Sequence, residues 1–76
     1  MSFLISLTTL EQIKTFVNLA SRQPFDILVG NERQTINGKD LIGMFCLDYT
    51  RPVKVHANCS ADEGAAFQQD AMALLQ

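Results

Sequence analysis

Residues 2 to 20 read SFLISLTTLEQIKTFVNLA, and this stretch decides how the fold begins. Its first part alternates between two faces, with one face made of the apolar residues Phe3, Ile5 and Leu7. That two-residue period is typical of a strand with one buried face. Its second part changes to apolar spacings of three and four, at Leu10, Ile13, Val17 and Ala20, with Phe16 beside them. The stretch therefore predicts a strand followed by an amphipathic helix that packs on the core.

The junction between the two elements carries a helix-start signal. Thr8 and Thr9 stand three residues before Glu11 and Gln12, so either threonine can accept a hydrogen bond from a first-turn amide. The later side chain can then reach back to the backbone of the threonine. Polar side chains such as Lys14 fall on the opposite, solvated face of the helix.

The remaining residues continue as alternating strands and helices. The helix ends before Pro24, because proline disfavours helical backbone in the preceding residue. We expect strands over 25–29 and 34–37 joined by a turn at 30–33, and a short helix from Asn37, as its N-cap, through Leu47. A fourth strand follows at 53–57. A Ser-x-x-Glu capping box at 60–63 then starts a terminal helix whose apolar stripe is Phe67, Ala71, Leu74 and Leu75.

This order of elements predicts one α+β domain over residues 1–76. Seventy-six residues leave no room for a second core. Each strand has one apolar face and the helices are amphipathic, which favours an open-faced two-layer sandwich. We expect a four-stranded, mostly antiparallel sheet with three helices on one face, in the order βαββαβα.

Composition excludes several classes of function. The formal charge is −2 and there is no basic run, so nucleic-acid binding has no support. No apolar stretch approaches the roughly 20 residues of a transmembrane helix, and the N-terminus has no secretory signal, which favours a cytoplasmic protein.

Cys46 and Cys59 lack zinc-ligand or redox spacing, and we interpret both as buried thiols. We expect no metal and no cofactor.

No motif in the sequence indicates an enzyme. His56 is the only histidine, and it falls on the outward face of the fourth strand with no nucleophile or carboxylate placed beside it. Calcium-loop, glycine-rich phosphate-binding and Gly-x-Ser-x-Gly patterns are missing. The more informative segment is residues 41–47, LIGMFCL, which has no charge in a helix too short to bury all its sides. Some of it must be exposed, and exposed apolar groups often mark a partner surface.

Several local strings, in this order and spacing, resemble HPr, the histidine-containing phosphocarrier of the sugar phosphotransferase system. From residue 16 onward they are FVNLASR at 16–22, FDI at 25–27, NGKDLIGM at 37–44 and SADEG at 60–64. The corresponding family patterns run like V-x-x-A-S-K, S-D-I, N-x-K-S-I-M-G-V and D-E-x-E-A. The resemblance covers about four fifths of the chain by these strings, and all of it by topology.

The resemblance implies a phosphate taken by a histidine at the start of the first helix, within G-x-H-A-R-P-A. Counting back from Val17 without a gap puts Thr9 in place of that histidine, Glu11 in place of the arginine and Gln12 in place of the proline. Glu11 thus places a negative charge where an arginine and helix amides would hold a phosphate. The acceptor motif is missing, and Thr9 is expected to serve as a helix cap.

The resemblance also assigns positions on the second helix. Asp40 aligns with a serine that some members use as a regulatory phosphosite, so its carboxylate resembles a weaker, permanent copy of that charge, or is a plain N-terminal aspartate. The partner-docking apolar residues of the family map to Leu41, Ile42 and Phe45.

The sequence thus predicts an HPr-like, non-catalytic regulatory or protein-binding module. Its partners would be phosphotransferase-system components or a regulator. Two alternatives remain: an active phosphocarrier with a displaced acceptor at His56 or Thr9, and a homodimer formed through an exposed strand edge.

Overall fold

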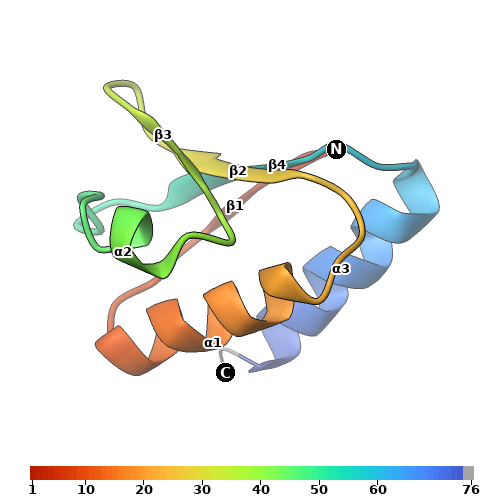
Figure 1. The fold of residues 1–76 in the computed structure, drawn as a ribbon, viewed down its shortest axis with the longest axis horizontal. Coiled ribbons are helices and arrows are strands. Elements are labelled where there is room, and N and C mark those ends of the chain that lie inside the picture. The colour runs from red at the N-terminus through yellow and green to blue at the C-terminus, as the bar shows by residue number, and fades with distance from the viewer. Residues whose placement is uncertain (75–76) are drawn as a thin grey trace.

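A computed structural model describes residues 1–74. Its elements are β1 (Ser2–Ile5), α1 (Leu10–Ser21), β2 (Ile27–Gly30), β3 (Thr35–Asn37), α2 (Leu41–Met44), β4 (Val53–Ala57) and α3 (Ala61–Leu74). The four strands form one sheet in the order β1-β4-β2-β3, and every pairing is antiparallel. The three helices lie on one side of this sheet (Figure 1), as the sequence predicts.

The strand register gives the sheet one buried and one open face. Phe3 pairs with Val55, which also pairs with Val29, and this row is buried beneath the helices. The next row joins Ser2, His56 and Leu28, all exposed. Because successive side chains of a strand point to opposite faces, the second row lies on the face away from the helices.

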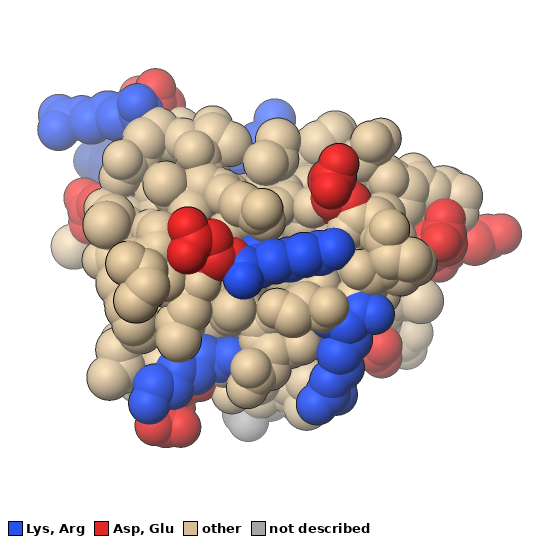
Figure 2. Space-filling model, viewed as in Figure 1, with Lys and Arg blue, Asp and Glu red and all other residues tan. Residues whose placement is uncertain are grey.

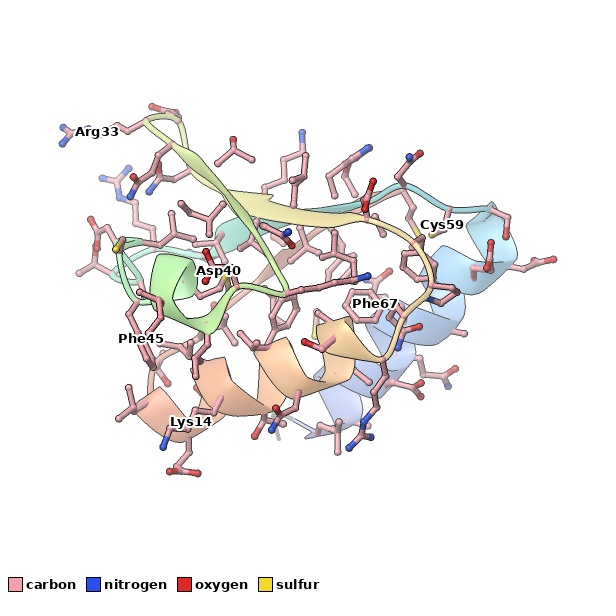
Figure 3. All side chains as sticks on the ribbon, in the orientation of Figure 1. Lys14, Arg33, Asp40, Phe45, Cys59 and Phe67 are labelled. Carbon is pink, nitrogen blue, oxygen red and sulfur yellow. The ribbon has the colours of Figure 1, made fainter. Side chains whose placement is uncertain are left out.

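The core is centred on Phe67 of α3. Its ring lies 5.9 to 6.1 Å, centroid to centroid, from three other phenylalanine rings, those of Phe3, Phe16 and Phe25. Phe16 and Phe67 each retain 1% exposure. Figure 3 shows Phe67 directed into the space between the sheet and the helices. One side chain thus joins the first strand, the first helix and the segment that leads into β2.

The first helix follows the predicted pattern with one difference. Ile13, Val17 and Ala20 are buried as predicted, but Leu10 is 56% exposed. Leu10 is the first residue of α1. A helical side chain leans back over the preceding turn, and at this position no helical turn precedes it. The prediction that Leu10 belongs to the buried stripe is wrong.

The second helix is shorter than predicted and begins later. It spans four residues, and its N-cap is Asp40 rather than Asn37. The Asn37 side chain instead accepts from the Lys39 amide at 2.9 Å, which makes a turn before the helix. Asn side chains compete with helix formation in this way. After the helix, the backbone amides of residues 45–47 donate to carbonyls three residues back along the chain. The Phe45 amide also donates to the Leu41 carbonyl, four residues back.

The start of α3 follows the sequence prediction, whereas the end of its buried stripe and the two cysteines do not. The capping box at α3 is present: the Glu63 amide donates to Ser60 Oγ at 3.2 Å, and the Ser60 amide donates to Glu63 Oε1 at 3.3 Å. Leu74 is 54% exposed, so it does not extend the buried stripe, and Leu75 lies outside the described residues. Cys46 is exposed and Cys59 half-buried, so the prediction of two buried thiols is wrong.

Candidate functional site

The N-terminus of α1 is closed by reciprocal hydrogen bonds. The Gln12 amide donates to Thr9 Oγ1 at 3.1 Å, and the Thr9 amide donates to Gln12 Oε1 at 3.2 Å. The Thr8 amide and hydroxyl also donate to Gln12 Oε1, at 2.8 and 2.9 Å. A helix N-terminus binds anions through amides that lack a partner. The backbone amides of Thr8, Thr9 and Gln12 already have a hydrogen-bond partner.

Glu11 adds a negative charge to the same turn. Its carboxylate is 85% exposed and lies 4.0 Å from the Lys14 ammonium group, one turn along α1. A carboxylate here interacts favourably with the positive end of the helix dipole. Its charge would repel a phosphate at the same helix end, because the carboxylate and the phosphate are both negative. The turn therefore holds capping hydrogen bonds and a carboxylate, and Lys14, the one Lys or Arg of α1, is paired with that carboxylate.

The second helix places the predicted apolar residues unequally. Ile42 is 73% exposed, Phe45 is 40% exposed, and Leu41 is half-buried against the core. Asp40 is exposed at the N-cap and makes no side-chain capping bond. Figure 3 shows Asp40 at the start of α2 and Phe45 at its far end, on the side toward the N-terminal half of α1. Ile42 and Phe45 therefore form the exposed apolar part of α2.

The sequence pattern assigns Leu10 to the buried stripe of α1 and does not predict it as part of an exposed apolar surface. Leu10, exposed at the start of α1, is a third large exposed apolar side chain on these two helices, which pack against each other. Its position immediately after the capping threonine is the signal that could have identified it. We define the α1–α2 surface as Leu10, Glu11, Asp40, Ile42 and Phe45.

His56 lies elsewhere, on the open face of the sheet. Its Nδ1 is 2.8 Å from the Ser2 hydroxyl oxygen, and both side chains are exposed. The neighbouring strand residues Val55 and Ala57 point the other way, into the core under the helices. The sheet therefore separates His56 from the α1 turn that holds Thr9, and the two are not brought together.

Within residues 1–74, no three His, Cys, Asp or Glu side chains are grouped so that they could hold a metal ion. In the same residues, no helix is long and apolar enough to span a membrane. Figure 2 shows basic and acidic side chains interspersed over the visible face, without a broad area of one sign.

Comparison with solved structures identifies the fold. A crystal structure of HPr-C-His from Thermoanaerobacter tengcongensis matches with a TM-score of 0.74 at 20% sequence identity, covering 92% of this chain and 88% of that one. No protein-family model and no curated protein sequence matches this chain. The chain thus has the fold of an HPr.

Proposed function

We propose that this protein is an HPr-like regulatory or protein-binding module that lacks the phosphoacceptor histidine. The observation that carries the proposal is the α1 N-terminus, where Thr9 serves as the helix cap and the neighbouring side chain is the Glu11 carboxylate. A phosphocarrier of this fold needs a nucleophilic imidazole and positive charge at that turn. The sole histidine of the chain is on the opposite face of the sheet.

The α1–α2 surface supports a binding role without chemistry. Its exposed apolar side chains are Leu10, Ile42 and Phe45, and a bound partner would remove them from water. Glu11 and Asp40 add two exposed carboxylates to the same helices. A fitting partner has a shallow apolar groove with Lys or Arg at its rim, because complementary charges steer association and set specificity. Components of a phosphotransferase system, or a regulator of one, are the partners we propose.

The test is affinity capture with the full chain as bait, followed by identification of the retained protein. Phe45→Ala and Ile42→Ala remove apolar anchors from the surface, and Leu74→Ala is the matched control because Leu74 is an exposed leucine at the end of α3, outside the α1–α2 surface. We expect the wild type and Leu74→Ala to retain the same phosphotransferase component or regulator, and the two α2 variants to lose it. Retention that is unchanged in both α2 variants would contradict the proposed surface.

Circular dichroism of each variant completes this test. Phe45 is too exposed to hold the core together, so the Phe45→Ala variant should keep the native spectrum. If it unfolds instead, Phe45 is a core residue and its assignment to a docking surface is wrong. The displaced-acceptor alternative, with phosphate on His56 or Thr9, requires a phosphorylated product and is tested separately by mass spectrometry.

A further inference from the structure

The face of the sheet opposite the helices carries an exposed apolar pair. Leu4 of β1 is 63% exposed and Leu28 of β2 is 43% exposed. They flank β4, where Leu4 pairs with Lys54 and Leu28 pairs with His56. Because the helices cover only the other face, nothing in residues 1–74 covers these two leucines (Figure 1).

A shallow groove runs from this pair to the end of the sheet beside the β2–β3 turn. Its lining includes Leu4, Leu28, Arg33, Arg51 and Lys54, which we call the sheet-face groove. The turn and the loop before β4 form its walls, and Gln34 Nε2 holds them together by donating to the Cys46 carbonyl at 2.9 Å. Figure 3 shows Arg33 projecting from the tip of the turn into solvent. The groove thus combines two apolar side chains with cations from three segments.

These cations have no close ion-pair partner. The one salt bridge within residues 1–74 is Lys14–Glu11, on α1. Asp48 is one of the carboxylates that line the groove. Its Oδ1 already accepts from the Thr50 amide at 2.9 Å and from the Thr50 hydroxyl at 2.7 Å. Those hydrogen bonds, with smaller contributions from Arg33 and Arg51, lower the pKa of Asp48, so it stays ionised without neutralising either guanidinium by direct contact.

The distribution of charge distinguishes the groove from the rest of the molecule. The groove region holds three of the six Lys and Arg residues with two carboxylates, Glu32 and Asp48. The other three cations share the remaining surface with six carboxylates. The groove is therefore net positive on a chain of formal charge −2. The charges therefore favour an acidic ligand at this groove over the rest of the surface, where carboxylates outnumber cations.

We propose that the sheet-face groove docks an acidic segment of a partner protein that carries an aliphatic side chain. The aliphatic side chain would lie over β4 and contact Leu4 and Leu28, and carboxylates on either side of it would reach Lys54 and the two arginines. This site is separate from the α1–α2 surface and does not depend on the proposed function.

The test uses the full chain labelled with ¹⁵N and a short synthetic peptide in which one leucine is flanked by glutamates. The control peptide has lysine in place of every glutamate. We expect amide shift changes at Leu4, Leu28, Arg33 and Lys54 with the acidic peptide, and none with the basic one. Raising the salt concentration should weaken the binding, because exposed ion pairs are screened.

Charge-reversal variants identify the residues responsible. Combining Arg33→Glu with Lys54→Glu should weaken binding about tenfold, since each exposed charge contact contributes only modestly. Lys14→Glu, on the helical side, should leave the affinity unchanged. Leu4→Ser reports the apolar contact independently of charge and should also weaken binding.

Four results of the peptide experiments would overturn the proposal. These are the absence of shift changes at millimolar acidic peptide, equal shifts with the basic peptide, shifts confined to Ile42 and Phe45, and full affinity in the double charge reversal. Sedimentation that shows the free chain associating through this face would assign the groove to a second copy instead, and would also contradict the proposal.

Discussion

Thr9 and Gln12 exchange hydrogen bonds across the first turn of α1: the Gln12 amide donates to the Thr9 hydroxyl at 3.1 Å, and the Thr9 amide donates to the Gln12 side-chain oxygen at 3.2 Å. The HPr resemblance places the phosphoacceptor histidine at position 9. Here the same position stabilises the helix, and its hydroxyl is engaged as an acceptor. This relationship is the physical basis for proposing a protein that retains the fold without the chemistry.

Thr9→Ala removes the capping hydroxyl and should lower the free energy of unfolding by about 1 kcal/mol, the usual cost of losing an N-cap side chain. Urea denaturation monitored by circular dichroism measures this change. Thr9→Ser keeps an oxygen in the same place and should recover most of the loss. Equal stability of the wild type and Thr9→Ala would show that the hydroxyl does not cap the helix.

Phe67→Ala and Phe45→Ala should differ sharply in stability. Phe67 is 1% exposed and contacts three other rings, so truncation opens a cavity and should cost about 3 to 5 kcal/mol. Phe45 is 40% exposed, and its truncation should cost about 1 kcal/mol. Thermal or urea unfolding of both variants tests this. A larger loss at Phe45 than at Phe67 would remove Phe45 from the docking surface.

Tyr49 should titrate above its ordinary range. Burial, reinforced by the charge of a Cys46 thiolate, raises the pKa of Tyr49 to about 12 from the ordinary 10.0. Its hydroxyl donates to the Met44 carbonyl oxygen. The chain has one tyrosine and no tryptophan, so phenolate absorbance follows this group alone. A midpoint near the ordinary value in the folded protein would contradict the buried placement.

The raised pKa of Tyr49 determines how the stability of the fold changes with pH. Between pH 10.0 and about 12 the unfolded chain has lost the Tyr49 proton and the folded chain retains it. Stability therefore falls as the pH rises through that interval and is fully present below it. In Tyr49→Phe this decline should disappear from the alkaline unfolding profile.

Gly38→Ala should destabilise the fold. The Gly38 amide donates to the Ile27 carbonyl at 2.7 Å, which brings the chain before α2 close to β2. An added Cβ would lie 2.8 Å from Ile27 Cγ2 and 3.2 Å from Val29 Cγ2, both on the buried face of the sheet. We expect a loss of about 1 to 3 kcal/mol by overpacking, measured by urea denaturation. An unchanged midpoint would mean that the two segments separate at no cost.

Local patterns in the sequence predict most of the fold. Alternation in β1 and β4, the Thr9 and Ser60 capping boxes and the Pro24 break identify the elements and the buried face of each strand. The sequence does not predict the length of α2. There the Asn37 side chain bonds to a nearby amide instead of capping a helix, and this competition depends on how the chain returns to the sheet.

The candidate site could be predicted only in part. The sequence places Ile42 and Phe45 in an uncharged helix, but their exposure depends on how α2 sits on α1 and β3. Leu10 fits the apolar period and is nevertheless exposed, because a first-turn residue has no preceding helical turn to cover. The sequence does not predict the sheet-face groove, because the turn that holds Arg33 comes close to Arg51 and Lys54 only when β2 pairs with β4.

The central claim is that the α1 turn of this chain does not accept a phosphoryl group. The direct measurement is intact-mass spectrometry after incubation with phosphoenolpyruvate and the phosphoenolpyruvate-dependent kinase of the sugar phosphotransferase system, with an HPr that carries the histidine as a positive control. We predict that the HPr gains a phosphoryl group and that this chain keeps its unmodified mass. A phosphoryl adduct on this chain, mapped to Thr9 or His56, would contradict the account.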